Sequence, residues 1–149
     1  MKIEGTETLS ASPQSVWDAL YDPEVLRACI PGCEEVVGFP KDGSVDIVVL
    51  QKVGPIKARF RGTITLDDVE KYREITLNGV GKGGAAGFVR GVARVQMNES
   101  GSGTDLIYDA EMRIGGKIAQ IGSRLIGGFA RKFTDQCFKN LRAHMQIDQ

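Results

Sequence analysis

A strict alternation of apolar and polar residues runs through the middle of this 149-residue chain and constrains its fold more than any other feature. From residue 56 to residue 66 every second side chain is apolar or small, and Lys, Arg and Thr fill the positions between. The same parity returns in the segments 75–79, 89–97 and 106–114. Successive side chains of a β-strand point to opposite faces, so a period of two predicts antiparallel strands with one buried and one solvated face.

Turn and capping residues divide the first third of the chain into short elements. Ser12-Pro13 is typical of a helix N-cap followed by the first helical position. Pro31-Gly32 ends a helical stretch, and Lys41-Asp42-Gly43 is a hairpin signal. These signals predict a strand, two short helices and two further strands, over residues 2–10, 13–21, 25–28, 33–39 and 44–53.

A glycine-rich turn over residues 100–103 separates the last two expected strands. A two-residue turn at Ser100-Gly101 predicts the register between them. In this register the expected cross-strand partners are Val95 with Leu106, Ala93 with Tyr108, Gly91 with Ala110 and Arg90 with Glu111. The last pair would join opposite charges on the outer face.

The period changes to that of a helix after Gly115-Gly116, with apolar residues at Ile118, Ile121, Leu125, Phe129, Phe133, Cys137, Leu141 and Met145. We expect one helix of about 28 residues, with four basic residues in a narrow sector of its surface. These are Lys117, Arg124, Arg131 and Arg142. The predicted class is α+β, in which a curved antiparallel sheet of about seven strands surrounds a long C-terminal helix within a single domain, 1–149.

Glycine makes up 19 of the 149 residues, which is about 13% against a usual ~7%. Small residues occupy strand positions whose side chains are expected to point inward. These are Ala58, Gly62, Gly79, Gly91, Ala93 and Ala110. Glycines also cluster around the start of the expected helix, at Gly115, Gly116, Gly122, Gly127 and Gly128. Two interpretations are open: close packing of the helix on a curved sheet, or an interior left unfilled for an apolar ligand.

We favour the ligand cavity. The residues expected to line it are Phe60, Gly91, Ala93, Leu106, Tyr108, Ala110, Met112, Ile118, Ile121, Leu125 and Phe129. Tyr108 is the one clear polar contact among them. An enzyme would need converging acid and base groups, which the inward parity does not offer.

Three segments carry a resemblance to a known family: VWDALYDPEVLRACIPGCEEV (16–36), GKGGAAGFVRGVARV (81–95) and RIGGKIAQIGSRLIGGFARKF (113–133). Through them the chain, over about residues 1–146, resembles the carbon monoxide dehydrogenase G-subunit family of the START/Bet v 1-like superfamily. The resemblance implies a helix-grip fold and an accessory role around a molybdenum-containing CO dehydrogenase, in its maturation or membrane association. It implies no catalytic residue.

Composition and motif context argue against several other functions. Nineteen basic and 19 acidic residues balance, which is untypical of a nucleic-acid-binding protein. The segment Gly79–Gly84 matches G-x-G-x-x-G, but a strand follows it where a dinucleotide site needs a helix. Three cysteines and one histidine are too few for a structural metal site, and we expect no metal and no cofactor.

The sequence favours a non-enzymatic protein that binds an apolar, lipid- or quinone-like molecule. The alternatives are a small lyase, cyclase or hydrolase of the same superfamily and a pure assembly factor. The N-terminal segment lacks the apolar core of a signal peptide, so we expect a cytoplasmic location. The four aligned basic residues of the helix are either a solvated face or a docking surface for an acidic partner or for the inner face of the membrane.

Overall fold

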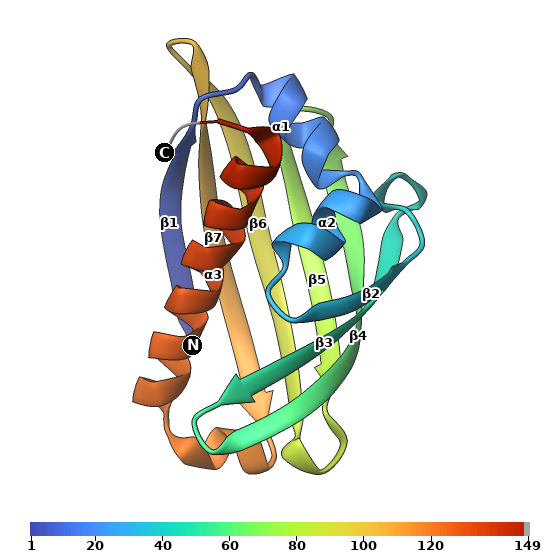
Figure 1. The fold of residues 1–149 in the computed structure, drawn as a ribbon, viewed down its shortest axis with the longest axis vertical. Helices are drawn as coiled ribbons and strands as arrows, with labels where there is room; N and C mark the ends of the chain where they lie inside the picture. Colours follow the sequence, from blue (N-terminus) through green and yellow to red (C-terminus); the bar gives the residue numbers. More distant parts are fainter. Residues whose placement is uncertain (148–149) are drawn as a thin grey trace.

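A computed structural model describes residues 1–147 as one curved sheet wrapped around a helix (Figure 1). The strands are β1 (Lys2–Leu9), β2 (Cys33–Val37), β3 (Ser44–Val53), β4 (Ile56–Glu70), β5 (Glu74–Lys82), β6 (Phe88–Ser100) and β7 (Gly103–Gly115). They pair antiparallel in the order β1-β7-β6-β5-β4-β3-β2. The predicted α+β, helix-grip architecture is confirmed.

Helices close the concave side of the sheet. They are α1 (Pro13–Leu20), α2 (Pro23–Cys29) and α3 (Ser123–Met145), with the short 3₁₀ helices η1 (Pro40–Asp42), η2 (Gly84–Ala86) and η3 (Lys117–Ile121). In Figure 1, α3 runs along the concave face, and α1 and α2 cover the end that we call the upper end. The β3–β4 turn, η2 and η3 form the lower end.

The two short helices begin where their caps predict. Ser12 caps α1, because its Oγ accepts a hydrogen bond from the Ser15 amide at 3.2 Å. Asp22 caps α2 in the same way, with its Oδ1 2.9 Å from the Glu24 amide. A proline occupies the first helical position of each.

The expected single C-terminal helix is two elements, so this prediction was wrong. Gly116 and Gly122 have φ angles of +82° and +98°, and the chain turns at both. Residues 117–121 form η3, and only the 23 residues from Ser123 onward are α-helical. Glycine reaches such backbone angles without the steric cost that a Cβ imposes. The apolar positions before and after Gly122 therefore belong to two separate elements.

The predicted register of β6 and β7 was also wrong, by two residues. The turn residues are Gly101 and Ser102, so Val95 lies opposite Tyr108 and Ala93 opposite Ala110. Gly101 has a φ of +58°, which tight hairpin turns require at their first central position. A shift of two keeps every side chain on its predicted face.

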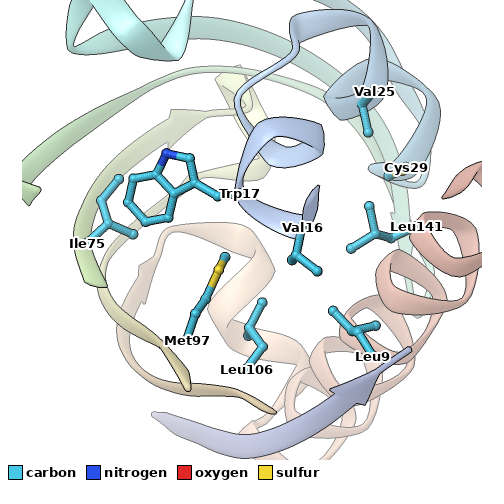
Figure 2. Packing of buried hydrophobic residues seen from close by; sticks show 9 residues of the cluster. All are labelled: Leu9, Val16, Trp17, Val25, Cys29, Ile75, Met97, Leu106 and Leu141. Carbon is cyan, nitrogen blue, oxygen red and sulfur yellow. The ribbon is translucent and has the colours of Figure 1, made fainter. Parts of the chain in front are cut away.

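Most of the buried apolar residues form two separate clusters. The upper cluster lies beneath α1 and α2 and consists of Leu9, Val16, Trp17, Val25, Cys29, Ile75, Met97, Leu106 and Leu141 (Figure 2). The lower cluster consists of Val53, Phe60, Ala86 and Ile118. The two clusters attach α3 and η3 to the sheet at opposite ends of the molecule.

We expect Leu141→Ala to lower the free energy of unfolding by about 3 kcal/mol, because it opens a cavity in the upper cluster. Leu141 is 2% exposed. The matched control is Leu125→Ala in the same helix, at a position 55% exposed, where a change within about 0.5 kcal/mol is expected. Urea denaturation of both variants measures the difference, and equal losses would contradict the assignment of Leu141 to the core.

Candidate functional site

Small residues form a belt across the middle of the concave face, between the two clusters. The register places Gly62 opposite Gly81, Gly79 opposite Gly91, and Ala93 opposite Ala110. Each of these six residues is only half-buried, although it lies on the side of the sheet that faces α3. Larger side chains at these positions would reach towards the helix, so the belt leaves the middle of the interior thinly filled.

Glycines on both walls of this region border open space. A methyl group added to Gly81 of β5 would meet no atom within 4 Å. The same holds for the half-buried Gly127 of α3. Well-packed interiors leave few voids larger than a water molecule. We call the region between the belt and the middle of α3 the inner groove, and it is the candidate binding site.

The residues expected to bind the ligand fall into four places. Gly91, Ala93, Ala110 and Met112 lie on the inner face of β6 and β7, and the first three belong to the belt. Phe60 and Ile118 are buried in the lower cluster, with Ile121 and Phe129 packed against it. Leu106 is buried in the upper cluster, and Tyr108 packs against it. Leu125 is exposed, at the lower end of α3.

A glycine-rich connection closes the lower end of the groove. The β5–β6 connection carries Gly83 against the ring of Phe60, where an added Cβ would lie 2.6 Å from the ring. Gly116 meets Gly87 of the same connection, with an added Cβ 2.6 Å from the Gly87 Cα. The segment that matches G-x-G-x-x-G leads through η2 into β6 and not into a long helix. Its glycines serve close packing at this end.

Tyr108 brings a hydroxyl to the inner face near the upper cluster. Its ring stacks on Phe138 of α3, with 5.8 Å between the ring centroids. The hydroxyl extends over Gly5 of β1, where a Cβ would lie 2.6 Å from it. Burial raises the pKa of Tyr108, and the nearby Glu7 raises it further. The hydroxyl is therefore protonated at neutral pH and able to donate a hydrogen bond.

Arg142 clamps α3 to β1 and does not belong to an exposed basic stripe. Its Nη1 lies 3.3 Å from Oε1 of Glu7, and its Nη2 donates to the Thr8 carbonyl at 2.9 Å. The Arg142 side chain is only 13% exposed. Sequence reasoning missed Glu7, since periodicity does not show which flank of the helix meets β1. The expected alignment of four basic residues on one helix was wrong, because Lys117 lies in η3.

The other three of the four basic residues singled out in the sequence lie in the lower half of the molecule. Lys117, Arg124 and Arg131 are all exposed. Leu125 projects beside Arg124 and is the most exposed large apolar side chain among the described residues. The lower part of α3 thus combines basic side chains with one apolar side chain in solvent.

The three cysteines are free thiols, of which Cys29 is buried and Cys33 and Cys137 are half-buried. Burial raises the pKa of the Cys137 thiol to about 12, and the neighbouring Cys29 contributes. Cys33 is half-buried, and its sulfur donates to the Glu35 carbonyl at 3.6 Å. A thiol reacts as its thiolate, so a raised pKa makes Cys137 unreactive.

We expect iodoacetamide to leave Cys137 unmodified in the native protein while Cys33 is alkylated. At about pH 9, a thiol with a pKa of about 12 is ionised in roughly one molecule in a thousand. Peptide mass spectrometry locates the modified sites. The urea-unfolded protein is the control, in which all three cysteines react. Rapid native alkylation of Cys137 would contradict its raised pKa.

Comparison with known proteins identifies the family. The family model described as the G subunit of carbon monoxide dehydrogenase (CoxG) matches residues 5–146. A search of curated proteins finds no match. No helix within residues 1–147 has both the length and the hydropathy needed to cross a bilayer.

Solved structures share the fold over nearly the whole chain. A conserved protein from Geobacillus kaustophilus is 26% identical, with a TM-score of 0.90, and the match covers 98% of this chain and 95% of that one. A protein from Chromobacterium violaceum is 18% identical, with a TM-score of 0.72 and 96% of each chain covered. A protein from Rhizobium leguminosarum is 16% identical, with a TM-score of 0.72, covering 98% of this chain and 94% of that one. With its family model matched from residue 5 to residue 146, the chain belongs to the carbon monoxide dehydrogenase G-subunit (CoxG) family.

Proposed function

We propose that this protein is a non-enzymatic accessory protein of a carbon monoxide dehydrogenase-type enzyme and holds an elongated apolar molecule in the inner groove. Family membership supports the accessory role. The belt of small, half-buried residues between two buried clusters is the observation that carries the ligand proposal. A lipid- or quinone-like chain fits this shape, because the groove is bounded at both ends by apolar side chains.

Burial of apolar surface supplies the binding energy. Each 100 Å² of ligand surface removed from water contributes roughly 2.5 kcal/mol. The groove offers aliphatic side chains, aromatic rings and glycine backbone to such a ligand. The Tyr108 hydroxyl can donate one hydrogen bond to a polar end group and so fix the orientation of the ligand.

Several polar side chains of the interior are already engaged in the structure, which favours binding over catalysis. Glu7 is held by Arg142. Gln51 donates from Nε2 to the Pro31 carbonyl at 2.5 Å. Thr134 donates to the Ala130 carbonyl at 2.9 Å. A general acid or base needs a group poised to exchange a proton with a substrate, and the raised pKa of Tyr108 keeps its hydroxyl neutral.

We expect Ala110→Leu to weaken binding of the apolar fluorophore N-phenyl-1-naphthylamine by about tenfold, because the larger side chain fills the belt. Ala110 lies between Ala93 and Ile3 on the inner face. Fluorescence titration measures the Kd. Val92→Leu is the matched control, on the outer face of β6 and 48% exposed. An unchanged Kd for a folded Ala110→Leu protein would remove the belt from the binding site. Mass spectrometry of copurifying small molecules identifies the natural ligand.

The exposed basic surface of the lower end supports a second part of the proposal, contact with the inner face of a membrane. Lys117, Arg124 and Arg131 lie in a stretch, residues 112–134, that contains five basic residues and no acidic one. An anionic leaflet attracts each basic residue near its surface by about 1 kcal/mol at low salt. Leu125 adds an apolar side chain at the same place.

Arg124→Gln/Arg131→Gln is expected to reduce cosedimentation with phosphatidylserine-containing vesicles at low salt, with little change in thermal stability. The control is Lys71→Gln/Arg73→Gln, which removes the same charge from the β4–β5 turn at the upper end. Equal loss in both variants would show that net charge alone, and not this surface, governs vesicle binding.

A further inference from the structure

The outer face of the sheet contains a hollow of about 560 Å³ that the inner groove does not explain. Outward side chains of β2, β3, β4 and β5 line it, among them Val37, Val48, Val80, Arg61 and Lys82. Val37 and Val80 are 52% and 38% exposed. The backbone of Gly62 also borders the hollow. The hollow therefore has a floor of valine side chains, with charged residues at its edges.

Like charges lie directly opposite each other around this hollow. Arg61 pairs in register with Lys82. On the neighbouring strands Arg90 pairs with Arg113, and Arg90 also lies opposite Val80 of the floor. Directly opposed like charges destabilise a sheet. All four of these side chains are exposed, so carboxylates of an external partner can reach them.

None of these cations forms an ion pair within the described residues, although Glu35 and Asp46 line the other side of the hollow. In the described residues the ion pairs are Arg59 with Glu34 and Arg142 with Glu7, so Arg61, Lys82, Arg90 and Arg113 have no partner there. Glu34 is fully engaged, with its two oxygens 2.6 and 3.1 Å from the Arg59 guanidinium. Asp46, on the far side of the hollow, accepts a hydrogen bond from Thr63 at 2.7 Å.

We infer that this hollow receives an acidic surface segment of the partner enzyme, with an aliphatic side chain on the valine floor and carboxylates against Arg61 and Lys82. The inference rests on the proposed accessory role. The charges favour a protein over a membrane, because Glu35 and Asp46 on the β2–β3 side of the hollow would repel lipid phosphates. A folded protein can present carboxylates to Arg61 and Lys82 on one side of the hollow and hydrogen-bond donors to Glu35 and Asp46 on the other.

Biolayer interferometry with purified carbon monoxide dehydrogenase holoenzyme of the same host tests this assignment. Arg61→Gln/Lys82→Gln is expected to raise the Kd at least about tenfold, chiefly through slower association, and to weaken its salt dependence. The matched control is Lys132→Gln/Lys139→Gln, which removes two exposed charges from α3 and should change the Kd by less than about twofold. The hollow variant should melt at the same or a higher temperature than the wild type, because it relieves a like-charge pair.

Unchanged holoenzyme binding by Arg61→Gln/Lys82→Gln overturns the inference. The inference is also overturned if this variant loses binding to vesicles and keeps binding to the enzyme. Absence of wild-type binding to the holoenzyme overturns it too. Uptake of N-phenyl-1-naphthylamine, measured on the same preparations, separates this result from the ligand proposal. Wild-type protein that takes up the fluorophore without binding the enzyme retains the ligand-holding role and loses the docking surface.

Discussion

Two apolar clusters at opposite ends hold α3 and η3 against the sheet, and the rest of the structure depends on this division. Leu141 anchors the end of α3 beneath α1 and α2, and Ile118 anchors η3 on Phe60. A continuous core would have placed large apolar side chains in the middle of the concave face as well. With stability concentrated at the ends, the middle of the concave face can consist of glycine and alanine without loss of the fold.

The glycines have two distinct roles that their number alone does not separate. Gly101, Gly116 and Gly122 take positive φ angles where the chain turns. Gly81 and Gly127 need no special backbone angle and border open space. Glycines such as Gly81 and Gly127 lower the stability of their strand or helix, although no backbone angle requires glycine there. Their cost is understandable if the space that they leave is occupied by a bound molecule, as we propose.

Charge is distributed unevenly over the folded molecule. Residues 50–66, 79–98 and 112–134 contain twelve basic residues and no acidic one, and all twelve are exposed. These segments include the whole lower end, with the β3–β4 turn, η2 and η3 (Figure 1). The upper end carries the acidic residues of α1 and α2. Such an asymmetry orients a protein as it approaches a charged partner, and the proposed membrane contact and the proposed enzyme contact use different parts of the basic half.

Most of the fold was predictable from the sequence, and most of what was missed concerns which elements meet. The period of two assigned the inner and outer faces correctly, because side chains alternate whatever the register. It could not fix the partner of Val95, which depends on whether Gly101 or Ser100 opens the turn. The helical pattern likewise placed Leu141 inside but could not show the break at Gly122 or the approach of Arg142 to Glu7.

The candidate binding site, like the fold, was predictable from the sequence only in part. Small residues on the inward parity were visible in the sequence, including Gly91, Ala93 and Ala110. That Phe60 and Ile118 close one end while Leu125 lies in solvent required the path of the chain through η3. The sequence by itself determined most of the elements, their faces and the family, since these follow from local periodicity and motif. Only the tertiary structure decided the register, the helix break and the outer hollow, because each arises where residues distant in the chain come into contact.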